Sequence, residues 1–356
     1  MGTNHLKKVA TLVMTGILAF SLTACGGSNN SSSENHQHSS ASDSGTDKKN
    51  PELKKITVGY IMVMDDAPAI LANDAKLYEK HGIQADLKMF SSGTDLIKAI
   101  VGGQVDVGVL GFTNALSWLE KGADLKVIGG AQMGYHSMIV RKDSDIKDIK
   151  DLKGKTVASQ KQGTTADIVL NGVTLAKDGL TREDLNMVYV EPSVAIQSLG
   201  AGKVDAAFVF EPYDSIAQAT MGAKSIYQVG KEWPFPCMVT ITSGDFLKKD
   251  KDAAFEALDA QKEAIEMLQK EPEKAAGFIT KRFIEEDSLA IPDGSKVKAT
   301  DIITKAIKNQ QYNYEITDDQ IKRMQEISDI MLKQGILKQQ IDVNKSLDLS
   351  WQKAAK

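Results

Sequence analysis

The sequence is poor in residues that crosslink a fold or clamp an anion. Only two cysteines occur in 356 residues, so an internal disulfide would need both Cys25 and Cys237. A chain of this length buries a core large enough to fold without one. The arginines are four in number: Arg141, Arg182, Arg282 and Arg323. Because the guanidinium fork suits carboxylates and phosphates best, their scarcity argues against a bidentate anion clamp.

Charge and motif content exclude several classes of function. The formal net charge is only −4, whereas nucleic-acid-binding domains are strongly basic, so nucleic acid is not an expected partner. No Gly-x-Ser-x-Gly, His-Glu-x-x-His or Cys-x-x-Cys arrangement occurs; these patterns mark hydrolase nucleophiles, zinc proteases and thiol redox enzymes. We therefore predict a protein that is not an enzyme and needs neither cofactor nor metal.

The first 24 residues have the pattern of a secretory signal. Lys7 and Lys8 precede an apolar run from Val9 to Leu22, and small residues lead to Cys25. The run is about 14 residues long, too short for a comfortable membrane span. Leu22-Thr-Ala-Cys25 resembles the bacterial lipobox, which implies that Cys25 becomes the lipidated first residue of the mature chain. Two acyl chains suffice for stable anchoring, so we expect the protein on the outer face of the cell membrane. An ordinary signal peptide with an incidental cysteine is the alternative.

A polar segment follows from residue 25 to residue 53. It is rich in Ser, Asn and Asp and lacks large apolar residues over most of its length. Such a segment cannot bury enough surface to offset the entropy of ordering, which predicts a disordered tether. His36 and His38 lie within it and are interpreted as polar tether residues.

The rest of the chain alternates between strand and helix patterns. From residue 54 onward it is long enough for two lobes. Runs of β-branched residues predict strands at 56–63, 85–90 and 105–110, and helical periodicity predicts helices at 69–80, 94–101 and 166–175. This alternation predicts an α/β fold with parallel strands.

An internal repeat predicts two similar lobes. Residues 96–106 match residues 195–205, with Gly103 aligned to Gly202 and Asp106 aligned to Asp205, an offset of 205 − 106 = 99. Each copy reads helix, glycine, strand, helix, glycine, strand. Two α/β lobes built this way enclose a cleft at the carboxyl ends of their strands, where ligands bind.

The C-terminal hundred residues are expected to be helical and to pack on the first lobe. Thr317 and Gln320 form the pattern of a capping box, and Gly335 marks the end of that helix. The buried faces of this region are expected to carry Phe255, Leu258, Ile265, Leu268, Met324, Ile327 and Met331.

Four segments together resemble the substrate-binding proteins of ABC importers of the nitrate, sulfonate and taurine type. They are residues 91–93, 103–111, 149–158 and 202–212. The resemblance implies a type II periplasmic-binding-protein fold with two hinge crossovers, near Tyr135–Val140 and Met238–Ser243. The implied partners are a small solute, an ABC permease and its ATPase, and the protein itself is expected to be a monomer. The expected domains are residues 1–24, 25–53, 54–137, 138–237 and 238–356: signal, tether, first part of lobe 1, lobe 2, and the return to lobe 1.

Loops that follow strands supply the candidate ligand-binding residues. Helix starts present unpaired N–H groups that favour anions, and Asp or Glu in such a loop favours a cationic or amide-bearing ligand. The candidates near or within these loops and near the hinge are Asp65, Asp66, Ser91, Ser92, Gly93, Phe112, Thr113, Asn114, Gln132, Tyr135, His136, Gln162, Gly163, Thr164, Thr165, Glu211, Tyr213 and Trp233.

Two classes of ligand remain open at this point. A sulfonate, nitrate or related anion would rest on the helix that begins near Thr164 and Thr165. An amine-bearing solute or a neutral heterocycle of the thiamine-pyrimidine kind would use Asp65, Glu211 and the aromatic residues. Two other classes of protein use the same scaffold: pyrimidine-precursor synthases, whose histidine counterpart would be His136, and surface adhesins.

Overall fold

The structure is a computed structural model that describes residues 53–354. The predicted signal segment, Cys25 and the tether up to residue 52 lie outside the described residues. The described part of the chain belongs to one compact unit. Within residues 53–354, no helix combines the length and the apolar composition that crossing a membrane would require.

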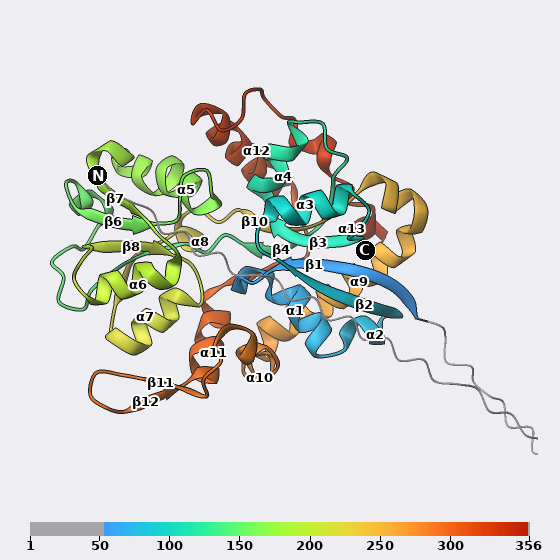
Figure 1. Ribbon diagram of the computed structural model, residues 1–356. Coiled ribbons are helices and arrows are strands. Elements are labelled where there is room, and N and C mark those ends of the chain that lie inside the picture. The colour runs from blue at the N-terminus through green and yellow to red at the C-terminus, as the bar shows by residue number, and fades with distance from the viewer. Residues whose placement is uncertain (1–52, 355–356) are drawn as a thin grey trace, which may run out of the picture. The chain divides into compact units, whose positions relative to one another are not determined.

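Eleven strands form two separate sheets (Figure 1). The first has the order β13 (Gln311–Tyr312), β4 (Lys126–Met133), β10 (Pro236–Thr242), β3 (Val107–Gly111), β1 (Lys54–Ile61), β2 (Ile83–Phe90). The second has the order β7 (Asn186–Tyr189), β6 (Thr156–Ser159), β8 (Ala206–Val209), β5 (Ser137–Val140), β9 (Lys224–Gln228). Strands β11 (Ser288–Ala290) and β12 (Lys296–Lys298) pair only with each other. The α/β class expected from the alternating pattern is confirmed.

Helices flank both sheets. Those of the first half are α1 (Ala67–Asp74), α2 (Leu77–Lys80), α3 (Gly93–Val101) and α4 (Phe112–Leu119). The second sheet is accompanied by α5 (Thr165–Val169), α6 (Pro192–Gly200), α7 (Tyr213–Met221) and α8 (Val229–Glu232). The tail contributes α9 (Gly244–Lys270), α10 (Pro272–Phe283), α11 (Ala299–Asn309), α12 (Asp318–Lys333) and α13 (Ser350–Ala354). A 3₁₀ turn, η1 (Met64–Asp66), joins β1 to α1.

The sequence repeat is a repeat of structure. In the first sheet β1 pairs in parallel with β2 and β3, and in the second β6 pairs in parallel with β7 and β8. The repeated aspartates explain why the motif contains this residue. Asp106 accepts a hydrogen bond of 2.8 Å from the backbone N–H of Thr57, and Asp205 accepts one of 2.8 Å from that of Thr156. Each carboxylate thereby fixes the beginning of one parallel strand to the N-terminal part of its neighbour.

The chain passes between the sheets twice. It leaves β4 of the first sheet and enters β5 of the second through residues 134–136, and it returns from β9 to β10 through residues 229–235. Strands β5 and β10 run antiparallel to their neighbours, and every residue in both is buried. The hinge ranges expected from the resemblance overlap these two strands. The lobe boundaries at residues 137 and 237 stay a prediction.

Two predicted helices are interrupted. The segment expected as one helix at 69–80 is α1 followed by α2, and Lys76 between them has a φ of 57°. The break changes the direction of the chain between α1 and α2. In α2 the Tyr78 hydroxyl accepts a hydrogen bond from Gln261 of α9. The helix expected at 166–175 continues after α5 as a π-helix, Leu170–Leu175. There a Cβ on Gly172 would lie 2.3 Å from Ile330 of α12, so only glycine allows this approach.

The tail helices follow their predicted pattern. Thr317 and Gln320 form the expected capping box at the start of α12, and Gly335, with a φ of 73°, follows its end. Seven apolar residues were expected on the buried faces. Six of them are buried: Leu258, Ile265, Leu268, Met324, Ile327 and Met331. Phe255 is partly buried and packs against the core. Helix α9 contacts α1 and α2, which flank the first sheet.

The repeated carboxylates give a prediction about stability. Replacing Asp106 or Asp205 with Ala leaves a strand N–H without its charge-assisted acceptor, which costs about 1–3 kcal/mol of unfolding free energy. We expect each variant to unfold at lower denaturant concentration than wild type. Asp143→Ala is the matched control, because its carboxylate is 85% exposed and lies 3.6 Å from Arg141. Equal midpoints for all three variants would contradict the structural role of the repeat.

Candidate functional site

Loops from both sheets meet in one buried polar cluster. Asp65 lies in η1, directly after β1, and Glu211 follows β8 of the second sheet. Asp65 is 4% exposed and Glu211 is fully buried. The tail segment 309–312 links the two loops, because Asn309 donates to Glu211 and the Tyr312 hydroxyl donates to the carbonyl of Met64, beside Asp65. We call the residues Asp65, Glu211 and Asp214 the acidic cluster.

Asp65 has no compensating partner. Neither of its carboxylate oxygens takes part in a hydrogen bond or ion pair with any residue of the described range, and Oδ1 is buried. Removal from water, with the nearby negative charge of Glu211 as a smaller cause, raises the pKa of Asp65 to about 8. Asp66 beside it differs, because its Oδ2 accepts a hydrogen bond of 2.7 Å from the backbone N–H of Ile61. Asp66 therefore has a local structural role.

Glu211 and Asp214 are hydrogen-bonded but not neutralised by a cation. Glu211 accepts bonds from the hydroxyl and backbone N–H of Ser215 and from Asn309 at the end of α11, the last at 2.7 Å. Asp214 accepts one of 2.6 Å from the hydroxyl of Tyr135. Burial, and then the charge of Asp214, raise the pKa of Glu211 above its ordinary value. No ion pair of the described residues includes any member of the acidic cluster.

A chain of donated hydrogen bonds leads from the first crossover to Asp65. Gln132 at the end of β4 donates to Gln310 at 3.0 Å, Gln310 donates to the Tyr312 hydroxyl at 2.8 Å, and that hydroxyl donates to the carbonyl of Met64 at 3.3 Å. All three bonds are donated in the same direction, away from Gln132. The Oε1 of Gln132 is left buried and without a donor.

Two further predicted loops touch each other. The hydroxyl groups of Thr113, in the first turn of α4, and Thr165, in the first turn of α5, form a hydrogen bond of 2.6 Å. Asn114 is nearby: a Cβ added to Gly93 would lie 2.9 Å from its Nδ2. Phe112 is fully buried in the core beside them. The predicted loops after β2, β3 and β6 therefore converge at one place.

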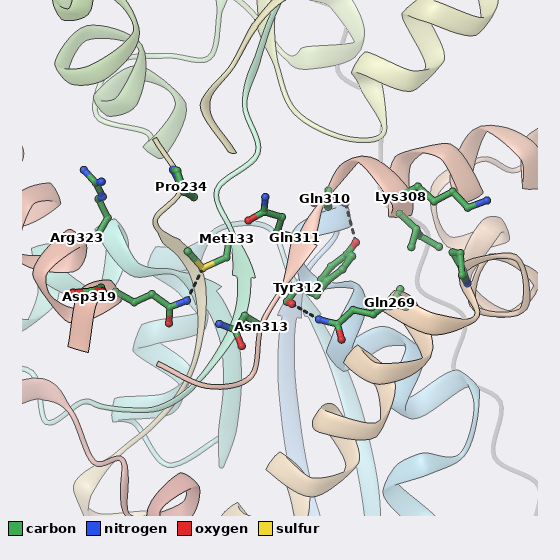
Figure 2. Close-up of a pocket in the computed structure, with 14 residues that line it drawn as sticks. Met133, Pro234, Gln269, Lys308, Gln310, Gln311, Tyr312, Asn313, Asp319 and Arg323 are labelled. Atoms are coloured by element: carbon green, nitrogen blue, oxygen red, sulfur yellow. Dashed lines mark hydrogen bonds between the residues drawn. The ribbon is translucent and has the colours of Figure 1, made fainter. Parts of the chain in front are cut away.

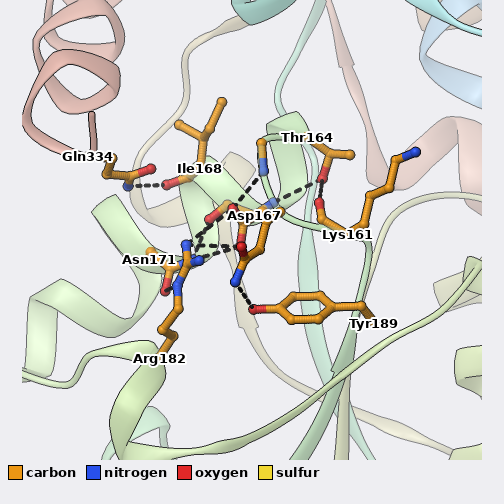
Figure 3. A network of polar contacts seen from close by, with 10 residues as sticks. Lys161, Thr164, Asp167, Ile168, Asn171, Arg182, Tyr189 and Gln334 are labelled. Carbon is orange, nitrogen blue, oxygen red and sulfur yellow. Dashed lines mark hydrogen bonds and ion pairs between the residues drawn. The ribbon is translucent and has the colours of Figure 1, made fainter. Parts of the chain in front are cut away.

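The predicted anion site at the start of α5 is occupied by the protein's own charges (Figure 3). Asp167 in the first turn accepts bonds from the backbone N–H of Gly163 at 2.9 Å and from Arg182 at 3.2 Å. Thr164 caps the helix by accepting from the backbone N–H of Asp167. Gln162 donates to the Tyr189 hydroxyl at 3.3 Å. An incoming anion would compete with a carboxylate already held at this helix start.

The loop before α3 has the same character. Ser92 caps the helix by accepting from the backbone N–H of Asp95, and the hydroxyls of Ser91 and Ser92 donate to the carboxylate of Asp95 at 3.1 Å and 2.8 Å. These bonds hold the pKa of Asp95 below its usual range. The predicted residues Ser91, Ser92 and Gly93 thus form a capped helix start with its own negative charge.

The aromatic candidates divide between the crossovers and the core. His136 is buried and stacks on Phe208, with ring centroids 5.6 Å apart. Burial lowers the pKa of His136 to about 4, so it is neutral near pH 7. Tyr213 packs edge-on against Phe210. Trp233 lies at the second crossover, where the guanidinium of Arg323 sits 4.3 Å from its ring centroid.

A pocket of about 750 Å³ lies beside the first crossover (Figure 2). Its walls come from Met133, the tail helices and β13, and none of the predicted site residues lines it. Amide side chains are frequent there; Gln269, for example, donates to the carbonyl of Tyr312 at 2.7 Å. Gln310 connects this pocket to the buried chain that ends near Asp65. We regard the acidic cluster as the candidate site, because the buried Asp65 within it has no hydrogen-bond partner among the described residues.

The sequence alone did not identify Asp214 of the acidic cluster or several residues that form hydrogen bonds around the cluster. They are Asp214, Ser215, Gln228, Asn309, Gln310 and Tyr312. The last three belong to an amide-rich stretch that begins at the end of α11 and precedes α12, a signal that would have marked it as polar. Among the described residues, no group of three or more His, Cys, Asp or Glu is placed to hold a metal ion.

Comparison with known proteins places the chain in a family. The model of the NMT1-like family matches residues 49–280. A protein of Bacillus subtilis (strain 168) named a putative aliphatic sulfonates-binding protein is 24% identical over 313 residues, covering 85% of this chain and 89% of that protein. A putative binding protein of Brucella abortus (strain 2308) is 24% identical over 248 residues, covering 68% of this chain and 75% of that protein.

Solved structures share the fold. The periplasmic aliphatic sulphonate-binding protein of Escherichia coli superposes with a TM-score of 0.70 at 20% identity, covering 82% of this chain and 97% of that one. The periplasmic nitrate-binding protein of Synechocystis PCC 6803 gives 0.63 at 16% identity, covering 86% and 89%. The fold is thus that of the periplasmic binding proteins, as the sequence motifs implied. The chain belongs to the NMT1-like family, and it is related to the solute-binding proteins of ABC import systems.

Proposed function

We propose that this protein is the solute receptor of an ABC importer, which captures one small organic solute between its two lobes and delivers it to a permease. The main observation behind this proposal is that Asp65 and Glu211, from loops that follow strands of different sheets, lie in the same buried polar site. A solute reaches such a site when the lobes separate, and it stays enclosed when they close. The related proteins named as sulfonate-, taurine- and nitrate-binding support the same general role.

The lobes and crossovers fit this mechanism. Residues 54–137 and 238–356 would form one lobe and residues 138–237 the other, joined by two short segments. Ligand shifts the equilibrium toward the closed form only to the extent that it binds that form more tightly. Contacts between elements of different sheets would favour closure: Thr113 with Thr165, Asn309 with Glu211, and Lys305 with Gln218.

The proposed setting is the outer face of the cell membrane. Residues 1–24 would be removed, Cys25 would carry the lipid, and residues up to 53 would tether a monomeric receptor near its permease and ATPase. A non-enzymatic role agrees with the names of the relatives, which are binding proteins.

A thermal-shift screen tests the receptor function. We expect one member of a panel of alkanesulfonates, taurine, nitrate, pyrimidines, polyamines and amino acids to raise the unfolding temperature of the purified protein. A ligand at 100 times its Kd stabilises the folded state by about 2.7 kcal/mol, a shift of several degrees for a chain this size. A folded protein that none of these solutes stabilises would contradict the proposal.

Substitution of the two cysteines tests the lipid anchor. In a bacterium that processes lipoproteins, we expect wild type to partition into the detergent phase of a Triton X-114 separation and Cys25→Ser to partition into the aqueous phase. Cys237→Ser is the matched control, because Cys237 is buried in β10 and has no part in anchoring. Identical partitioning of wild type and Cys25→Ser would refute the anchor.

A further inference from the structure

The buried atoms without partners around the acidic cluster are predominantly acceptors. They include Oδ1 of Asp65, Oε1 of Gln132 and Oε1 of Gln228. The neighbouring amides donate to other groups: Gln132 to Gln310, Gln310 to the Tyr312 hydroxyl, Gln228 to the Tyr135 hydroxyl at 2.8 Å, and Asn309 to Glu211. A buried acceptor without a donor costs free energy. The amide oxygens of Gln132 and Gln228 thus receive no hydrogen bond from the described residues, and the cluster contains no positive charge.

No basic side chain of the described residues supplies that charge. The titratable groups around Asp65 are Asp66, Glu211, Cys237 of β10 and Tyr312 of β13, and none of them is a cation. His136 is neutral near pH 7. Buried carboxylates in proteins are ordinarily paired or bound to metal, and within residues 53–354 no group of three or more His, Cys, Asp or Glu is placed to hold a metal ion.

We propose that the solute carries a protonated amine or an amidinium group, and that this cationic end binds between Asp65 and Glu211 while the amide oxygen of Gln132 accepts from another of its N–H groups. This inference rests on the proposed receptor function and narrows its ligand class. A cationic group would supply the positive charge that the site lacks, together with several N–H donors directed at carboxylate oxygens. A sulfonate carries only acceptors, so it would leave the buried Oε1 of Gln132 without a donor.

Matched probes with one ring and different charges provide the test. Benzylamine and benzamidine carry the two cationic groups, and benzenesulfonate carries the anion on the same ring. We expect millimolar benzylamine or benzamidine to raise the unfolding temperature of the full chain, and benzenesulfonate to have no effect. In Asp65→Asn the affinity for the cationic probe is expected to fall about tenfold or more, because a charge-assisted contact is lost. Asp143→Asn, an exposed carboxylate at a distance, should bind as wild type.

The dependence on pH separates a ligand contact from a structural role. The pKa of Asp65 in the folded protein, about 8, lies far above that of an unfolded aspartate. Ionisation therefore opposes folding, and the stability of wild type relative to Asp65→Asn is expected to fall as pH rises from about 4 to 8. The cation needs the ionised carboxylate, so probe affinity is expected to rise over the upper part of that range, with proton release detectable by calorimetry in two buffers.

Each outcome decides the inference. Stabilisation by benzenesulfonate alone would overturn the cationic ligand while leaving the receptor function intact. An Asp65→Asn variant that is less stable than wild type at every pH, and binds the probes equally, would give Asp65 a purely structural role. Failure of both cationic probes would also overturn the inference, whereas the receptor function stands or falls on the wider solute panel.

Discussion

The burial of three carboxylates without a cation is the constraint on which the centre of this molecule depends. Removing a charged group from water costs several kcal/mol unless partners replace the lost hydration. In this cluster the three carboxyl groups receive unequal numbers of hydrogen bonds in place of water. Glu211 and Asp214 receive hydrogen bonds from several side chains, whereas Asp65 receives none from the described residues. The free protein therefore keeps Asp65 protonated near neutral pH, and only a partner with donors makes its charge favourable.

Hydrogen-bond donors from distant parts of the chain offset the cost of burying these carboxylates. The donors to the cluster come from the first crossover (Tyr135), from α7 (Ser215) and from the end of α11 (Asn309). The tail is thus more than a cover for the first sheet, because it supplies polar atoms to a site built mainly by the repeated α/β units. A cluster assembled from three separate regions of the chain forms only when those regions pack together, so the site depends on tertiary structure and not on any one segment.

The repeating part of the fold could be predicted from sequence, and the assembled site only in part. Asp106 and Asp205 recur at a fixed offset because each does the same backbone task in its own sheet, and such local rules leave a pattern. Asp65 and Glu211 could be placed in strand-end loops for the same reason. Their proximity, and the contributions of Asn309 and Tyr312, depend on how the tail packs against both lobes. No local periodicity records that packing, and the break at Lys76 shows tertiary contacts overriding a helical pattern.

The two ligand classes left open by the sequence differ in where their charge would be compensated. The anion hypothesis relied on helix starts, yet those of α3 and α5 already hold Asp95 and Asp167. In the second case Arg182, one of four arginines in the chain, is committed to Asp167. A fold shared with sulfonate- and nitrate-binding proteins leaves the chemistry of the site free to change, because function resides in the side chains placed on the fold. In this chain the meeting point of the loops holds buried carboxyl groups without a cation beside them, and that arrangement is the physical basis for proposing a solute of opposite charge.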